Sequence, residues 1–153
     1  MRKPTPTAAK TELSLAVQYA TNDEHVPTRT QLRRWILAAL ERDAAITLRI
    51  VDRAEGRALN RDFRHKDYAT NVLTFVYDKV GNGLVGDIVL CAPVVASEAK
   101  TQRKALLHHY AHLVVHGTLH LQGHDHERKR DAEMMESREI EILSRMKISN
   151  PYL

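Results

Sequence analysis

The sequence predicts an α+β domain in which about four strands form a mixed sheet packed by helices. Four short segments combine apolar alternation or β-branched content with flanking polar residues, as strands do. Segments with apolar residues at helical spacing lie between and after them, in the order typical of a mixed domain. The chain has 153 residues without a repeat or long linker, so we expect one domain over 12–153 and a disordered basic start over 1–11.

The first half of the chain predicts two strands that alternate with two helices. Residues 13–19 alternate apolar and polar side chains, and 45–51 form a second apolar, β-branched run. Thr28 or Thr30 can cap the helix between them, whose apolar face consists of Leu32, Trp35, Ile36, Ala39 and Leu40. Residues 52–64 predict a short helix with three residues facing inward, Ala54, Ala58 and Leu59.

The next part of the chain predicts a pair of strands joined by a turn. Residues 71–77 are rich in β-branched and aromatic side chains. Glycines at 81 and 83 mark the turn, and 84–91 form the fourth strand. Gly86 lies inside that strand, where a glycine indicates a bulge or a close approach of another segment.

Helices fill the rest of the chain. Pro93 suits the start of a helical region, which continues or restarts to give a helix near 104–122. Gly123 is placed to end that helix. Residues 127–146 predict the last helix, with an apolar face formed by Met134, Met135, Ile140 and Leu143.

Composition excludes several classes of protein. Cys91 is the only cysteine, so an internal disulfide and a cysteine-only zinc site are both excluded. No apolar run approaches the roughly 20 residues of a membrane helix, and no apolar segment of a secretory signal follows the basic start. We therefore expect a cytoplasmic protein with no membrane association. The net charge of +4 suits a nucleic-acid or ribosomal partner, although many unrelated enzymes are as basic.

Histidines give the strongest functional signal. His116 and His120 are four residues apart, so on a helix they project from one face, roughly 6 Å apart at Cβ. Gly123 can turn the chain back so that His126 approaches the same point. Three imidazoles can bind one Zn²⁺ per chain and leave a position open for water, which is the arrangement of a catalytic zinc.

The spacing H-x-x-x-H-x-x-G-x-x-H is that of the metzincin proteases, with one important difference. In those proteases a glutamate follows the first histidine and acts as general base. Gly117 occupies that position here, so a zincin-type protease is disfavoured. The alternative to a metal site is a helix of solvated or core histidines, which three histidines at this spacing argue against.

Neighbouring residues leave alternatives open. His112 either supports the site or a phosphate, or is a satisfied core residue, whereas His108 and His109 are expected on the helix surface. His124 is a possible alternative ligand. Asp125 either hydrogen-bonds a ligand imidazole or is a turn residue.

A basic segment precedes the third strand. Arg61, Arg64 and Lys66 lie at a helix end and in the following loop. Arginine holds phosphate through paired N–H donors and stays cationic. Considered alone, this segment is typical of a solvated charged face. Beside a zinc site it supplies the charge neutralisation that phosphodiester cleavage needs.

Segments 60–75, 86–88 and 112–126 resemble the YbeY family of bacterial endoribonucleases, within a likeness that spans about 13 to 143. The resemblance implies a zincin-like sheet crossed by the metal helix, zinc on His116, His120 and His126, and an essential arginine at Arg61. It also implies single-strand-preferring cleavage in late 16S rRNA 3′-end maturation and ribosome quality control. The implied partners are rRNA and small-subunit ribosomal proteins, with no small-molecule cofactor.

The sequence departs from the family pattern at three positions. His65 and Ala69 stand where the family often has glycine and proline, which affects the expected loop conformation. His124 stands where a tyrosine is common, and an extra imidazole there can alter metal preference. Nickel or another divalent ion would tolerate the same imidazoles.

The resulting hypothesis is metal-assisted RNA cleavage. Arg61 and His116 are the expected catalytic residues, and Arg64, Lys66 and His112 are candidates for phosphate binding. The general base stays open between a second water, His112 and the RNA 2′-hydroxyl. Two alternatives remain: a zinc hydrolase of a non-RNA bond, which Gly117 argues against, and a ribosome-assembly factor with structural zinc, which the open ligand position argues against.

Overall fold

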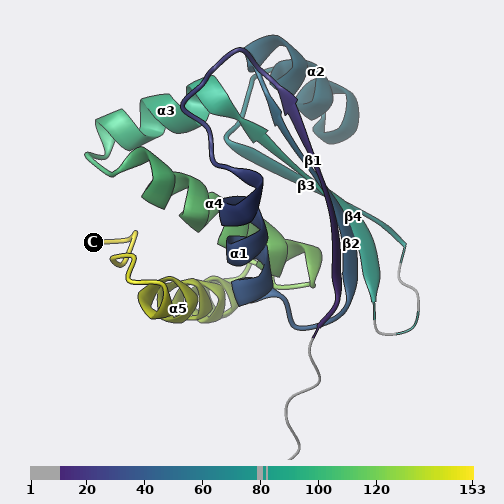
Figure 1. Cartoon of the computed structure of the whole chain (residues 1–153), viewed down its shortest axis with the longest axis vertical. Coiled ribbons are helices and arrows are strands. Elements are labelled where there is room, and N and C mark those ends of the chain that lie inside the picture. Colours follow the sequence, from purple (N-terminus) through teal and green to yellow (C-terminus); the bar gives the residue numbers. More distant parts are fainter. Residues whose placement is uncertain (1–10, 79–80, 82) are drawn as a thin grey trace, which may run out of the picture.

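The computed structural model describes residues 11–78, 81 and 83–153 (Figure 1). Except for Thr11, the predicted basic start lies outside these residues, as does Asn82 of the predicted turn. In chain order the elements are β1 (Leu13–Ala20), α1 (Arg29–Ala39), β2 (Ala44–Val51), α2 (Arg53–Arg64), β3 (Val72–Asp78), β4 (Leu84–Cys91), α3 (Ala92–Thr101), α4 (Leu106–Leu121) and α5 (Lys129–Arg145).

The four strands form one mixed sheet, which confirms the predicted fold class. Their order is β1-β2-β4-β3. β1, β2 and β4 run parallel, and β3 pairs antiparallel with β4 at one edge. The predicted strands agree with the observed ones to within about a residue, because alternation and β-branched content are strong local signals.

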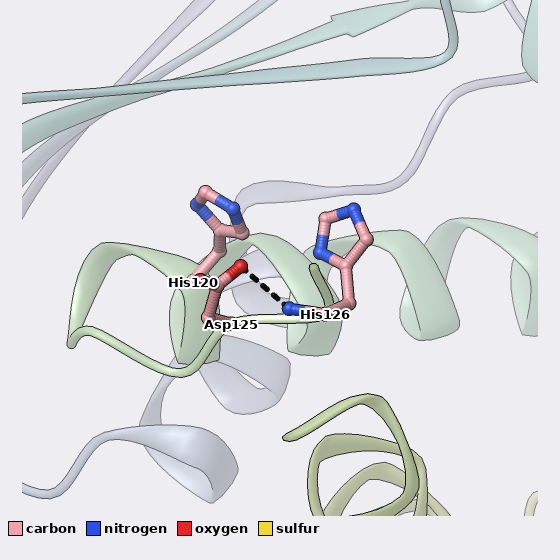
Figure 2. A group of neighbouring side chains, drawn as sticks. All are labelled: His120, Asp125 and His126. Carbon is pink, nitrogen blue, oxygen red and sulfur yellow. Dashed lines mark hydrogen bonds between the residues drawn. The ribbon is translucent and has the colours of Figure 1, made fainter. Parts of the chain in front are cut away.

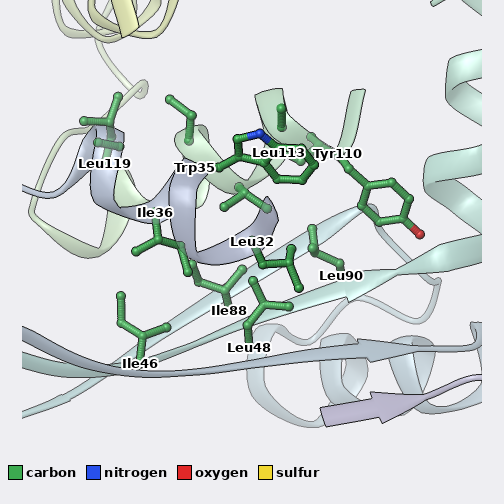
Figure 3. Packing of buried hydrophobic residues seen from close by; sticks show 14 of the residues in the cluster. Leu32, Trp35, Ile36, Ile46, Leu48, Ile88, Leu90, Tyr110, Leu113 and Leu119 are labelled. Atoms are coloured by element: carbon green, nitrogen blue, oxygen red, sulfur yellow. The ribbon is translucent and has the colours of Figure 1, made fainter. Parts of the chain in front are cut away.

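Helices cover the two faces of the sheet unequally. α1 and α4 pack against one face, where Trp35 and Ile36 meet Ile46, Ile88 and neighbouring side chains in the main core (Figure 3). α2 lies against the other face, over a smaller cluster formed by Val51, Leu73, Val89 and Cys91. Among the described residues, no helix combines the length and apolar character that crossing a bilayer requires.

α1 begins at the first of its two predicted caps. Thr28 is its N-cap and forms a capping box with Gln31, in which each side chain binds the other residue's backbone N–H. Four of the five predicted apolar residues lie on the buried face of the helix, and Leu40 is the C-cap. The cap therefore fixes where the helix starts.

α2 matches its predicted face only in part. Ala58 and Leu59 are half-buried, and Leu59 packs against the smaller cluster, but Ala54 is exposed. The fully buried residues of the helix are Gly56 and Asn60. A Cβ on Gly56 would lie 3.2 Å from Cys91 Sγ, a tight contact, so the helix lies close to the sheet here. The Asn60 amide donates to the backbone carbonyl of Tyr68 at 2.9 Å. This hydrogen bond holds the loop after α2 in place. Because Asn60 is polar, the apolar pattern did not predict that it is buried.

Gly86 allows the end of α4 to pack against the sheet. A Cβ at this position would meet the Phe75 carbonyl oxygen at 2.8 Å and a Leu121 methyl at 3.0 Å. The predicted close approach is therefore confirmed. The irregularity in pairing lies in the facing strand β3, between Val76 and Asp78.

The helical region after Pro93 restarts rather than continues. Arg103, with a φ of 54°, separates α3 from α4, and α4 spans Leu106–Leu121, close to the predicted 104–122.

α5 also corrects a predicted face. Met134 is 63% exposed, whereas Met135 is buried. The buried positions are Met135, Glu139, Ile142 and Leu143, at the spacing of one helical face. The apolar face predicted for this helix was therefore wrong at Met134. The observed buried face includes the carboxylate of Glu139.

Candidate metal centre

Three histidine rings meet at the end of α4. His116 and His120 lie one turn apart on the helix. Gly123, with a φ of 97°, reverses the chain, and the His124 backbone N–H donates to the Leu119 carbonyl. The chain returns, so His126 faces the same point, and Figure 2 shows its ring beside that of His120.

The ring separations are close to those around a common ion, with His116 and His120 about 1 Å wider apart than such a site requires. The ring centres of His116 and His120 lie 6.2 Å apart, those of His116 and His126 5.5 Å, and those of His120 and His126 5.6 Å. Three imidazoles bound to one tetrahedral zinc have centres roughly 5 Å apart, from Zn–N bonds of about 2.0–2.1 Å. The structure therefore brings the three predicted ligands together.

Two of these rings are held from outside through Nδ1. His120 Nδ1 lies 3.1 Å from the Thr74 hydroxyl of β3, and His116 Nδ1 lies 3.1 Å from Glu139 Oε1 of α5. Metal-binding histidines usually bond a protein group through the nitrogen that does not bind the ion. Nε2 of both rings is thus the nitrogen left for a cation.

Glu139 is the residue that the sequence analysis missed. It is fully buried, and its carboxylate accepts from His112 Nε2 at 2.9 Å and from the Tyr152 hydroxyl at 2.9 Å, besides contacting His116. Burial by itself raises the pKa of Glu139, but the histidine hydrogen bonds outweigh it and lower the pKa to about 2. The buried carboxylate is therefore ionised. Its place on the apolar face of α5 was a signal that could have identified it.

His120 has the electrostatics of a ligand. Burial, followed by the neighbouring His116 and His126, lowers its pKa from the ordinary value. A neutral imidazole keeps the lone pair that a metal needs.

Asp125 lies next to the rings and holds the turn. Its Oδ1 accepts from the backbone N–H of His126 at 2.6 Å, drawn in Figure 2, and from that of Glu127 at 3.1 Å. This is the turn role considered for it. One ligand atom each from His120, Asp125 and His126 also lie within 4.8 Å of one another, a grouping that does not include His116. Either three histidines or two histidines and Asp125 could hold a metal ion. The hydrogen bond between Glu139 and Nδ1 of His116 favours the three histidines, because it leaves Nε2 of His116 for the ion.

A pocket of about 460 Å³ opens beside the histidines. Arg64 and Lys66 line it together with His116, His120 and His126. The Arg64 guanidinium donates to the Thr74 carbonyl and lies over the Phe75 ring, 5.3 Å from its centre. Two basic residues therefore line the same pocket as the three histidines, an arrangement that suits an anionic substrate.

Arg61 lies elsewhere. It is not among the residues that line the pocket, its side chain is 55% exposed, and its Nε contacts Asp62 Oδ1 at 3.2 Å. Of the two arginines predicted to act on phosphate, the structure brings only Arg64 to the histidines.

The remaining histidines separate into different environments. His108 is exposed, as expected, but His109 is buried against Glu98 at 3.0 Å, so its predicted surface position was wrong. His112 faces Glu139 and Tyr152, on the side of His116 away from the pocket. His124 pairs with Glu41 at 2.9 Å. His109 is buried because its side of α4 packs against α3, which carries Glu98.

The fold is a mixed sheet crossed by a helix that ends in a three-histidine cluster beside a basic pocket. Such a cluster could hold a metal ion in the way that hydrolases use. The chain belongs to the endoribonuclease YbeY family, whose model matches residues 16–147. The resemblance found in the sequence is thereby confirmed.

Curated relatives match nearly the whole chain. Endoribonuclease YbeY of Thiobacillus denitrificans is 58% identical over 142 residues, which cover 92% of this chain and 97% of the relative. That of Nitrosomonas europaea is 56% identical, covering 93% of this chain and 86% of the relative. The solution structure of TM1509 from Thermotoga maritima matches with a TM-score of 0.54 and 24% identity, covering 86% of this chain and 91% of that chain, which supports the fold.

Proposed function

We propose that this protein is a zinc-dependent endoribonuclease that cuts single-stranded rRNA in late 16S rRNA 3′-end maturation and ribosome quality control. The observation that carries the proposal is the convergence of three imidazoles beside a pocket with Arg64 and Lys66. The relatives of 54–60% identity are named endoribonucleases. RNA supplies the anionic substrate that such a pocket suits.

His116, His120 and His126 would hold the ion. A bound divalent cation supplies a Lewis acid that withdraws charge from a phosphate oxygen. Thr74 and Glu139 keep the two α4 rings in place through their outer nitrogens.

Arg64 is the residue that we assign to the phosphate. It stays cationic, and the Thr74 carbonyl and the Phe75 ring fix its position in the pocket wall. Lys66 adds a second positive charge to the same wall. The catalytic role that the resemblance gives to Arg61 stays a prediction, since its exposed side chain would have to turn toward the RNA.

Location and partners are part of the same proposal. We infer a cytoplasmic protein that acts on rRNA together with small-subunit ribosomal proteins. The excess of 23 lysines and arginines over 19 aspartates and glutamates supports an anionic partner.

The experiment compares cleavage of a single-stranded rRNA fragment with its duplex form, using wild type and four variants. His120→Ala is expected to lose both the ion and cleavage. Arg64→Ala is expected to keep the ion and lose about 100-fold or more in kcat. Arg61→Ala tests the other arginine, and Arg34→Ala, which removes an exposed arginine of α1, is the matched control.

Three results would contradict the proposal. Equal cleavage by wild type and by metal-free protein would exclude a metal-dependent reaction. A protein that binds zinc but cuts no RNA would favour the assembly factor with structural zinc. Cleavage of casein in place of RNA would favour a hydrolase of another bond.

A further inference from the structure

A second pocket lies on the face of the sheet that α2 only partly covers. Its volume is about 330 Å³. It is lined by side chains of α2 and of all four strands, Gln18, Thr47, Arg49, Glu55, Leu59, Phe63, Phe75, Tyr77, Asp87 and Val89. We call it the sheet-face pocket. Its volume lies in the range of small-ligand sites.

Aromatic side chains gather at the sheet-face pocket. Both phenylalanines of the chain line it, and their rings meet edge to face at 5.5 Å. Phe63 is 63% exposed and Tyr77 is 65% exposed, although large aromatic residues are usually buried. Exposed rings beside an open sheet are the surfaces on which RNA-binding proteins stack bases.

The charged groups of the sheet-face pocket are already paired. Arg49 holds Glu55 through two guanidinium nitrogens, one of them at 2.8 Å, and the Tyr77 hydroxyl donates to Asp87 at 2.7 Å. The pocket therefore suits an uncharged ligand with hydrogen-bonding edges, and its two carboxylates disfavour phosphate. The pocket beside His116, His120 and His126, which we call the metal pocket, has the opposite character, since Arg64 and Lys66 line it.

Arg64 lies close to both pockets. It lines the pocket beside the histidines, and its guanidinium carbon lies 5.3 Å from the ring centre of Phe75, which lines the sheet-face pocket. Because a nucleotide's base is one sugar away from its phosphate, a phosphate beside Arg64 leaves a neighbouring base within reach of Phe63 and Phe75.

We propose that the sheet-face pocket binds one unpaired nucleobase of the RNA, from a nucleotide that flanks the cleaved phosphodiester. The inference rests on the proposed function and deepens it. A base that enters the pocket cannot stay paired, so the pocket gives a physical reason for a preference for single-stranded RNA.

The test combines protein variants with abasic RNA. Short single-stranded rRNA oligonucleotides carry an abasic site at one position at a time around the cleaved bond, and both the dissociation constant and cleavage are measured. For the intact RNA, Phe63→Ala is expected to weaken binding by about 5- to 100-fold. Tyr77→Ala serves as a second variant, and both residues are exposed enough to be replaced without loss of folding. Met134→Ala, equally exposed on α5, is the matched control and is expected to leave binding unchanged.

The decisive comparison is the combination of both changes. With wild type, an abasic site at one position should weaken RNA binding about as much as Phe63→Ala weakens binding of the intact RNA. With the Phe63→Ala variant, the same abasic site should weaken binding little further. If no abasic position weakens binding by wild type, or if the two losses multiply, the inference is overturned while RNA cleavage by wild type still supports the proposed function. If wild type neither binds nor cuts RNA, both fail.

Discussion

Replacing Glu139 by glutamine is expected to weaken metal binding without touching a metal ligand. The variant keeps the shape of the side chain but removes the charge that His116, His112 and Tyr152 contact at 3.1, 2.9 and 2.9 Å. Loss of such an outer partner typically costs about 10- to 100-fold in metal affinity. These hydrogen bonds are also no longer made to a charged group, so the free energy of unfolding should fall by about 1–3 kcal/mol.

The assay for this variant is competition for zinc against a chromophoric chelator. Glu133→Gln makes the same chemical change at an exposed position of α5 and is expected to bind zinc like wild type. If Glu139→Gln also matched wild type in zinc affinity, the carboxylate would not position His116, and the outer hydrogen bond would have no part in the site.

Three further predictions concern stability and ligand choice. Gly86→Ala should lower the free energy of unfolding by about 1–3 kcal/mol, because its Cβ would meet the Phe75 carbonyl at 2.8 Å; urea denaturation measures this, and unchanged stability would refute the close approach. Burial lowers the pKa of His109, although Glu98 opposes this effect. Because the unfolded chain therefore binds the proton more readily, the free energy of unfolding should decline as the pH falls below about 6.5. His109→Gln should show a smaller decline in denaturation series with EDTA, and an identical pH profile would contradict the assignment. Asp125→Asn should lower zinc affinity by less than about tenfold if three histidines hold the ion, and loss of the metal would identify Asp125 as a ligand.

The elements of the fold were predictable because each carries a local signal. Alternation predicted β1 to within about a residue, and the two candidate caps, Thr28 and Thr30, placed the start of α1 to within two residues. The two fully buried residues of α2 were not predictable in this way. Gly56 is buried because the sheet comes close, and Asn60 because its amide binds a loop carbonyl, so neither position depends on apolar character.

In the candidate site, too, the residues linked by local chain geometry were predictable, and those brought together by packing were not. The spacing of His116, His120 and His126 around a helix end predicted their convergence, since these positions are linked by local chain geometry. Glu139 comes to the site from another helix, and no local pattern connects it to His116. Arg61 and Arg64 look equivalent in the sequence, but only Arg64 lines the pocket, where its guanidinium donates to the Thr74 carbonyl of β3.

The most direct test of the metal centre is a crystal structure of the zinc-loaded protein, with anomalous data collected at the zinc edge. A single peak per chain is expected, bonded to Nε2 of His116 and His120 and to a ring nitrogen of His126, with one coordination position occupied by solvent. A peak bonded to His120, Asp125 and His126 while His116 stays apart, or no peak at all, would contradict the three-histidine site.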